Sequence, residues 1–164
     1  MVEIDRIRRR VIAEDGSEAE YDRLLIATGS TPFILPIPGK DLQGVIGYRD
    51  IADTQAMIDT AKTHTHAVVI GGGLLGLEAA NGLKLRGMDV TVVHIGEWLL
   101  ERQLDQTSGQ LLQSALESRG LKFRLCEQTQ ALIDAGNGRV GSVQFKNGAV
   151  SYTHLRAHET PEHL

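Results

Sequence analysis

The sequence predicts an α/β fold with a parallel sheet, and three observations lead to this prediction. A run of β-branched residues ends in glycines at the spacing G-x-G-x-x-G, which are Gly71, Gly73 and Gly76. Apolar residues then recur at helical intervals. Two further apolar strand patterns follow at 90–95 and 121–126, with a second helical pattern between them. A β-α-β-α-β order of this kind implies right-handed crossovers and a parallel sheet.

The three glycines meet the requirements of a dinucleotide-binding turn. The first allows a tight turn, the second lets the backbone approach a pyrophosphate, and the third lets the helix pack on the strand. The helix N-terminus offers free N–H groups and the positive end of its dipole to phosphates. A glycine-rich turn that binds nothing is the alternative. Because strand, glycine turn and helix occur in the order that makes the motif specific, we predict a Rossmann-like fold whose dinucleotide-binding residues are Gly71, Gly73, Leu74, Leu75 and Gly76.

The composition excludes several classes of function. A net charge of −4 gives no general attraction to nucleic acid or to anionic membranes, and aromatic residues make up only 4% of the chain, too few for base stacking. No apolar run approaches the roughly 20 residues that span a bilayer. The single cysteine, Cys126, and the lack of a signal peptide predict a cytoplasmic location. His64 and His66 lack a third ligand nearby, so no metal site is predicted.

The segments around this centre are predicted from turn signals. Residues 1–29 are expected to be β structure, with a turn at Glu14–Gly16 and a buried strand at 21–27. The arginines at 8–10 are expected on an exposed strand or turn rather than at an anion site. A proline-rich stretch, 31–39, is expected to cross between domains.

The later segments are predicted in the same way. Asp50 is expected to cap a helix that runs to about Lys62, with Ile51, Met57 and Ile58 facing inward. A small β-hairpin is expected around residues 136–138.

The last fifteen residues do not fit the pattern of the rest. From Val150 to Leu164 the chain lacks an apolar period and resembles the translation of a transposase-type sequencing adaptor. Such segments are set aside before a fold is inferred. We therefore expect residues after Ala149 to take no part in the fold, because polar sequence offers too little apolar area to offset its ordering entropy.

The chain resembles the flavin- and pyridine-nucleotide-dependent reductases, and within them the large subunits of assimilatory NAD(P)H nitrite reductases. The likeness covers 2–148, and four stretches carry it: YDRLLIATGS at 21–30, PIPG at 36–39, YRDIAD at 48–53, and VVH at 92–94 together with LERQLD at 100–105. It implies that 1–47 is the latter part of an FAD-binding domain, 48–66 a linker helix, and 67–149 a truncated NAD(P)H-binding domain.

The resemblance also implies roles for particular residues. Thr28 and Gly29 match a turn near FAD, for which an ordinary strand end is the alternative. Arg49 matches an arginine near the flavin, for which a surface ion pair is the alternative. Glu78 matches a glutamate beside the nicotinamide and is the candidate catalytic residue, although a glutamate in a first helical turn also stabilises the helix dipole. The upstream FAD pyrophosphate turn and the siroheme and iron–sulfur ligands are expected outside this sequence.

The choice between NADH and NADPH is expected to depend on the residues after the second strand. That strand usually ends in an acidic residue that binds the ribose 2′-hydroxyl, whereas here it ends in His94, followed by Glu97. A neutral imidazole can bind a ribose hydroxyl, and Glu97 would repel a 2′-phosphate, although it could equally be a solvated loop residue. Arg102 is the candidate partner for a 2′-phosphate if NADPH is preferred. The sequence favours NADH.

The sequence therefore predicts a piece of an oxidoreductase module that passes hydride from NAD(P)H to FAD. Electrons would continue to an acceptor in further domains, as in nitrite reductase, or on a separate protein, as in ferredoxin- or rubredoxin-type reductases. A nucleotide-sensing module without enzyme activity is the remaining alternative. The chain by itself is expected to retain no FAD.

Overall fold

The computed structural model describes residues 1–29 and 32–152. Contacts within the chain divide it into two compact units, Met1–Thr31 and Pro32–Leu164. Contacts therefore do not divide the chain at the predicted boundary between residues 47 and 48, because 32–47 belong to the second unit.

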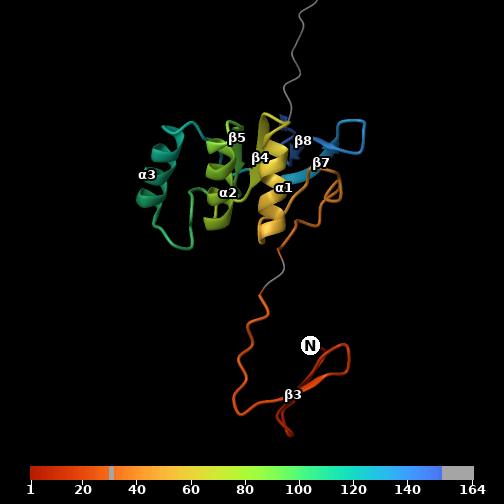
Figure 1. The fold of residues 1–164 in the computed structure, drawn as a ribbon. Helices are drawn as coiled ribbons and strands as arrows, with labels where there is room; N and C mark the ends of the chain where they lie inside the picture. Colours follow the sequence, from red (N-terminus) through yellow and green to blue (C-terminus); the bar gives the residue numbers. More distant parts are fainter. Residues whose placement is uncertain (30–31, 153–164) are drawn as a thin grey trace, which may run out of the picture. The chain divides into compact units, whose positions relative to one another are not determined.

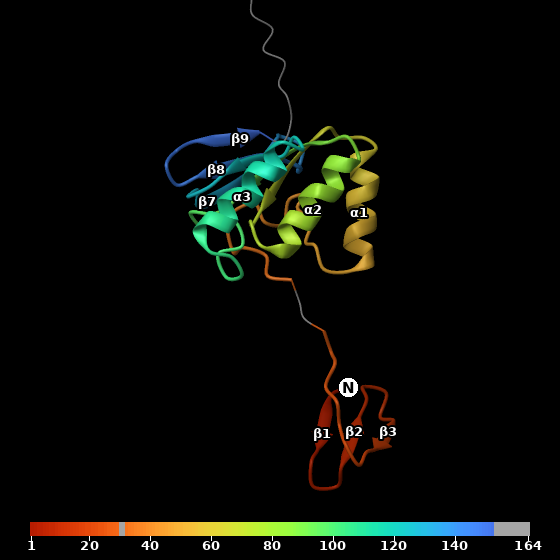
Figure 2. The same ribbon diagram turned by 90° about the vertical axis from the view of Figure 1, so that its left-hand side faces the viewer.

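The first unit is a small antiparallel sheet in the order β1-β2-β3 (Figure 2). Its strands are β1 (Glu3–Asp5), β2 (Arg10–Ile12) and β3 (Glu18–Glu20). The turn predicted at Glu14–Gly16 joins β2 and β3, and Gly16 adopts a φ of 82° there. The predicted β structure at the start of the chain is thus confirmed.

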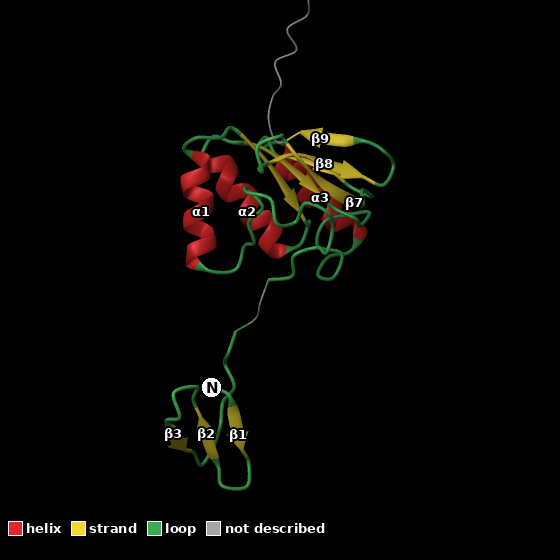
Figure 3. Cartoon of the chain, turned by 90° about the vertical axis from the view of Figure 1, so that its right-hand side faces the viewer, coloured by secondary structure: helices red, strands yellow, loops and turns green. Residues whose placement is uncertain are grey.

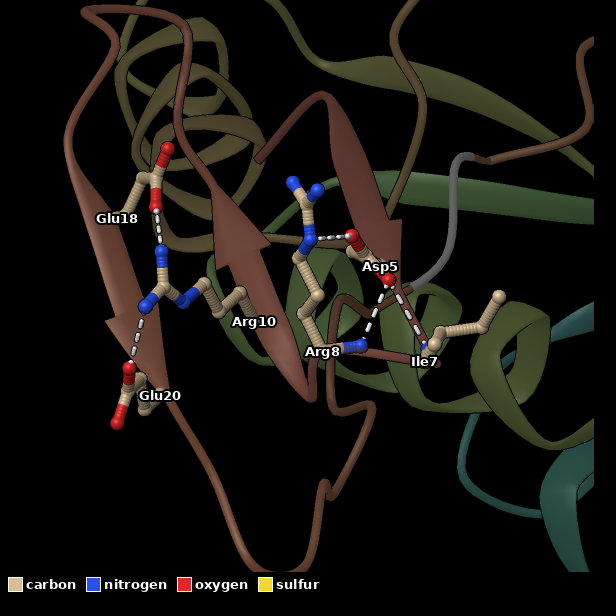
Figure 4. A network of polar contacts seen from close by, with 6 residues as sticks. All are labelled: Asp5, Ile7, Arg8, Arg10, Glu18 and Glu20. Atoms are coloured by element: carbon tan, nitrogen blue, oxygen red, sulfur yellow. Dashed lines mark hydrogen bonds and ion pairs between the residues drawn. The ribbon is translucent and has the colours of Figure 1, made fainter.

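Polar contacts join β2 to β3 and stabilise the turn that follows β1 (Figure 4). Arg10 pairs with Glu18 at 3.1 Å and with Glu20 at 2.7 Å. At the end of β1, Asp5 Oδ1 accepts the backbone N–H of Arg8 at 2.9 Å. The arginine run is an exposed turn leading into a strand, as predicted, and exposed ion pairs of this kind contribute about 1 kcal/mol or less.

The buried strand predicted at 21–27 is wrong. The segment forms no strand, and Leu25 and Ile26 are 87% and 62% exposed. A strand needs a neighbouring strand to satisfy its backbone hydrogen bonds. Among the residues that the structure describes, no strand pairs with residues 22–27.

The second unit has three layers, with helices on one face of a parallel sheet and an antiparallel sheet on the other (Figures 1 and 3). The helices are α1 (Ile51–Ala61), α2 (Leu74–Leu85) and α3 (Gln106–Glu117). The parallel sheet is β4 (His66–Ile70), β5 (Asp89–Val93) and β6 (Lys122–Arg124), in that order. The antiparallel sheet is β7 (Thr129–Asp134), β8 (Val140–Phe145) and β9 (Val150–Tyr152). The predicted β-α-β-α-β order and the β-hairpin are confirmed.

Side chains of β5 point alternately to the two faces of the parallel sheet and contribute to both hydrophobic cores of this unit. Val90 and Val92 face the helices and are fully buried with Ala80 of α2. Val93 faces the opposite way and packs against Phe145 of β8. Successive residues of a strand point to opposite faces, so a parallel strand buried on both faces reads as a continuous apolar run.

Helix α1 begins where the sequence indicates. The Asp50 side chain accepts the Asp53 backbone N–H at 2.9 Å, and the Asp53 side chain accepts the Asp50 N–H at 3.3 Å, forming a capping box. Met57 packs on the core as predicted. The inward orientation predicted for Ile51 is wrong, because this first helical residue is 87% exposed.

The proline-rich segment is ordered by the antiparallel sheet. The Pro38 carbonyl accepts the Leu132 N–H at 2.9 Å. At the next residue, Gly39 has a φ of 84°, and a Cβ there would collide with the Leu132 carbonyl oxygen. Ile37 and Val45 pack on the cluster around Phe145. This segment is therefore part of the second unit.

The predicted lack of structure after Ala149 is wrong for the first three residues of the tail. Val150–Tyr152 forms β9 and pairs antiparallel with β8, opposite Ser142–Gln144. Backbone hydrogen bonds depend little on side-chain type, so a turn at Asn147 and Gly148 lets whatever follows extend the ladder. The rest of the predicted tail, 153–164, lies outside the described residues. None of the helices formed by described residues has the length and apolarity that crossing a membrane requires.

Candidate dinucleotide-binding site

The glycine motif forms a tight turn between β4 and α2. Gly71 extends the parallel ladder by donating its N–H to the Val93 carbonyl at 2.8 Å, and then adopts a φ of 126° that favours glycine. A Cβ on Gly76 would collide with the Gly71 carbonyl oxygen. The first and third glycines therefore allow the chain to turn and the helix to approach the strand.

The space beside the middle glycine of this turn, Gly73, is open. Gly73 is the N-cap residue of α2, and a Cβ placed on it would meet no atom within 4 Å. No side chain caps the helix, and no acidic residue lies in its first turn. The N–H groups of Leu74, Leu75 and Gly76 have no partner within the helix, because helix geometry leaves the first amides unpaired. Such a terminus attracts anions.

Glu78 lies one turn into α2 rather than in its first turn, which begins at Leu74. The effect of a helix dipole on a charge falls off beyond the first turn, so the dipole gives a weaker reason for a glutamate here than the sequence suggested. The Glu78 side chain is exposed and forms no hydrogen bond or ion pair with the described residues. It shares a face of the helix with exposed Leu75, three residues earlier.

His94 is held on both sides of its ring. The residue is 8% exposed, its Nδ1 lies 3.1 Å from the Gly72 backbone nitrogen, and its Nε2 lies 2.6 Å from Glu101 Oε2. The hydrogen bond from His94 is the main cause that lowers the pKa of the Glu101 carboxyl. A hydrogen bond from His94 to a ribose would require one of these contacts to break. That contact stays a prediction.

Sequence reasoning missed Gly72 and Glu101. The loop after β5 returns to the glycine turn, where Leu100 donates its N–H to the Gly72 carbonyl at 3.1 Å and Leu99 is fully buried. His94 and Glu101 lie within two stretches, 92–94 and 100–105, that form one of the four parts of the family resemblance. The co-occurrence of a histidine and a glutamate in those stretches was the available signal.

The remaining predicted residues are exposed, and none of their side chains forms a hydrogen bond or ion pair with the described residues. Glu97 is an exposed loop residue without a partner among the described residues, and Arg102 is also exposed. Thr28 and Gly29 are exposed residues of the first unit. Arg49 is exposed in the second unit and forms no side-chain ion pair with the described residues, so the alternative of a surface ion pair is not observed.

No metal site or redox pair is found in the part of the chain that the structure describes. No group of three or more histidine, cysteine, aspartate or glutamate side chains is placed to hold a metal ion there. Cys126 lies after β6 in an exposed position with a φ of 57°.

Comparisons with known proteins agree with this geometry. A family model described as pyridine nucleotide-disulphide oxidoreductase matches residues 1–156. An NAD(P)H nitrite reductase of Bacillus subtilis is 49% identical over 148 residues, which are 90% of this chain and 18% of that protein. The chain thus spans less than a fifth of that relative.

Solved structures give the same result. A ferredoxin reductase from Rhodopseudomonas palustris matches with a TM-score of 0.87 and 26% identity, over 94% of this chain and 38% of that one. A water-forming NADH oxidase from Lactobacillus brevis, solved with NADH bound, matches with a TM-score of 0.77 and 26% identity, over 93% and 34%.

Proposed function

The chain belongs to the pyridine nucleotide-disulphide oxidoreductase family, and from this premise we propose that its second unit binds the nicotinamide dinucleotide of an NAD(P)H:FAD oxidoreductase. One observation carries the proposal. The open face at Gly73 adjoins an uncapped helix N-terminus, which suits a pyrophosphate. When both cofactors are bound, NAD(P)H supplies hydride and FAD accepts it.

Each part of the turn has a distinct role in this proposal. The N–H groups of Leu74, Leu75 and Gly76 donate to the pyrophosphate oxygens. Gly73 lets the phosphates approach the backbone, because a side chain there would occupy the open space. The Gly72 N–H does not take part, because it donates to His94.

A role toward FAD stays a prediction for Thr28 and Gly29, which belong to the first unit, and for Arg49, which belongs to the second. No step through FAD is therefore assigned to these residues. We expect the purified 164-residue chain to lack FAD, and a stoichiometric yellow flavin on the purified chain would contradict this.

The nitrite reductase relative supports one electron acceptor and the ferredoxin reductase structure supports another. We favour the nitrite reductase type, with siroheme and an iron–sulfur cluster in further domains, because the sequence identity to that relative is higher. The gene sequence on either side of this segment decides between them. A long downstream extension with cysteine ligands supports the nitrite reductase type, and its lack supports a separate acceptor protein.

Calorimetric titration of the 164-residue chain with NADH tests dinucleotide binding. Gly73→Ala should reduce affinity by about tenfold or more, or about 1.4 kcal/mol, without lowering the melting temperature. Gly82→Ala is the matched control, since Gly82 lies within α2, away from the N-cap, and a Cβ there also meets no atom within 4 Å. Binding that is undetectable for the unaltered chain would contradict the proposal.

We further propose that Glu78 lies beside the nicotinamide. Its carboxylate is exposed and unpaired among the described residues on the helix that begins at the pyrophosphate turn. In the full-length protein, Glu78→Gln should slow flavin reduction by NADH while leaving NADH affinity within about twofold, because hydride transfer depends on geometry at the reacting ring. An unchanged rate in stopped-flow measurements would contradict this role.

The preference for NADH rests on Glu97, since both ring nitrogens of His94 are engaged. An exposed carboxylate on the loop after β5 repels a 2′-phosphate if it reaches the ribose. We propose a preference of about tenfold in affinity, and Glu97→Gln should reduce it. Tighter binding of NADPH than of NADH would overturn this assignment and favour Arg102 as the phosphate partner.

A further inference from the structure

The backbone of Gly72 is bonded on both sides to the loop that follows β5. Its N–H donates to His94 Nδ1 at 3.1 Å, and its carbonyl accepts the Leu100 N–H at 3.1 Å. A Cβ on Gly72 would approach His94 Cγ at 2.8 Å and Leu99 Cδ2 at 2.9 Å. The glycine turn therefore rests directly on the imidazole ring and on a buried leucine.

The hydrogen bonds fix which ring nitrogen of His94 carries a proton. A backbone N–H can only donate, so Nδ1 must present a lone pair to Gly72. The proton of a neutral ring is then on Nε2, and it points at Glu101 Oε2, 2.6 Å away. A chain of donors runs from the Gly72 amide to the ring and from the ring to the carboxylate.

We propose that His94 and Glu101 are positioning residues that hold the glycine turn in the conformation that binds the dinucleotide. The inference rests on the proposed function of that turn. Fixing the Gly72 peptide fixes the start of α2, and so sets where the N–H groups of Leu74–Gly76 point. Glu101 acts through His94, by holding the ring in the tautomer that can accept the Gly72 N–H.

Backbone hydrogen bonds of His94 also support this role. The His94 backbone N–H donates to the Arg124 carbonyl at 2.8 Å, and the His94 carbonyl accepts the Glu127 N–H at 3.0 Å. The main chain at His94 is thus tied to β6 and to the segment beyond it. A ring fixed on a tied backbone is preorganised, and its hold on Gly72 requires little further ordering when a ligand binds.

Nitrogen-15 NMR of the labelled 164-residue chain tests the tautomer without any ligand. At pH 8 the imidazole of His94 should carry its proton on Nε2, with Nδ1 in the chemical-shift range of an unprotonated, hydrogen-bonded nitrogen. In Glu101→Ala this preference should weaken, and in Glu101→Gln it should persist, because the amide oxygen still accepts the Nε2 proton. A proton on Nδ1 in the unaltered chain would overturn the proposal.

NADH titration of paired His94 variants tests the effect on binding. His94→Asn places an amide oxygen near the position of Nδ1 and should keep affinity within about threefold of the unaltered chain. His94→Gln places its amide near the position of Nε2, cannot accept the Gly72 N–H in the same way, and should lose about tenfold or more. Should His94→Gln fail to fold, Glu101→Ala serves instead, since its exposed position tolerates truncation, and it should also weaken NADH binding.

The outcomes separate this inference from the proposed function. If the unaltered chain binds NADH and His94→Asn, His94→Gln and Glu101→Ala all bind it equally well, His94 and Glu101 do not position the turn. If the unaltered chain shows the Nε2 tautomer but binds no NADH, the proposed function is wrong although the hydrogen bonds exist.

Discussion

Two segments of this chain share a sequence pattern, an apolar run that ends at a glycine turn, yet only one of them is a strand. Residues 66–70 form β4, which pairs in parallel with β5 along its whole length and leads to the turn at Gly71. Residues 21–27 lead to Gly29, which also has a positive φ, but they form no strand and expose Leu25 and Ile26. The apolar pattern does not account for the difference.

The neighbours of each segment explain why 66–70 forms a strand and 21–27 does not. β4 lies beside β5, and α2 covers the sheet through Ala80 and Leu83. Among described residues, 22–27 have no paired strand and belong to no buried cluster. A strand becomes stable when its hydrogen bonds and its faces are both satisfied. The glycine turn of the candidate dinucleotide site therefore follows a strand that has both a paired neighbour and packed faces.

Hydrogen exchange should show the largest contrast between the two segments. The amide of Val92, in the central strand of the parallel sheet, should exchange at least about 10³-fold more slowly than that of Leu25, corresponding to about 4 kcal/mol of protection. The reason is that Val92 is fully buried and paired whereas Leu25 is 87% exposed. Comparable protection at the two residues, measured by NMR and corrected for intrinsic rates, would show that 21–27 has a partner.

The next largest contrast is expected between Gly76→Ala and Gly29→Ala in their effect on the free energy of unfolding. Gly76→Ala should lower the free energy of unfolding of the second unit by about 1–3 kcal/mol, because its Cβ collides with the Gly71 carbonyl oxygen. Gly29→Ala should change the unfolding free energy of the second unit by less than about 0.5 kcal/mol, because the strain that its φ of 73° imposes on alanine falls on an exposed segment outside that unit. Urea unfolding measures both, and equal losses would contradict the contrast.

Acid should weaken the second unit through an ion pair at the start of its strands. Lys122 Nζ lies 2.7 Å from Asp89 Oδ2, and this hydrogen bond is the main cause that lowers the pKa of Asp89 below its ordinary value of 3.8. A lowered pKa stabilises the fold above the ordinary value, and that stability is lost as pH falls through the lowered pKa. The urea concentration at the unfolding midpoint should therefore fall when the pH is lowered below about 4. The fall should be smaller in Asp89→Asn, which lacks the carboxylate.

The matched control for this pH effect lies in the first unit. The pKa of Asp15 is also lowered, chiefly by a hydrogen bond from the Ser17 side chain. Asp15→Asn should leave the acid dependence of the second unit unchanged, because Asp15 belongs to the other unit. If Asp89→Asn and Asp15→Asn reduce the pH dependence of the urea midpoint equally, the ion pair between Asp89 and Lys122 does not cause the loss of stability in acid.

Most of the second unit could be predicted because its signals are local. The period of the apolar residues, the cap at Asp50 and the three motif glycines each act within a few residues, and each is confirmed in the fold. The pairing of β9 could not be predicted, because a ladder accepts strands of almost any composition. The prediction of a strand at 21–27 was wrong because, among the described residues, no strand pairs with 22–27 and no buried cluster includes them.

The backbone geometry of the candidate site was predictable to the same extent. The glycine turn and the helix start are one continuous segment, so their spacing specifies their geometry. The contact between His94 and Glu101 depends on the course of a loop in which Leu100 adopts a φ of 57°. No periodicity signals such a loop. Whether Glu78, Glu97 and Arg49 touch a cofactor stays a prediction.

The proposed function of the second unit depends most directly on where NADH binds. Backbone amide shifts of the labelled 164-residue chain, followed during an NADH titration, locate the bound dinucleotide. We predict that the largest changes fall on Gly73, Leu74, Leu75 and Gly76, while Thr28 and Gly29 stay unchanged. Saturable changes confined to the first unit, or no change at the start of α2 at millimolar NADH, would contradict the claim that the glycine turn binds the pyrophosphate.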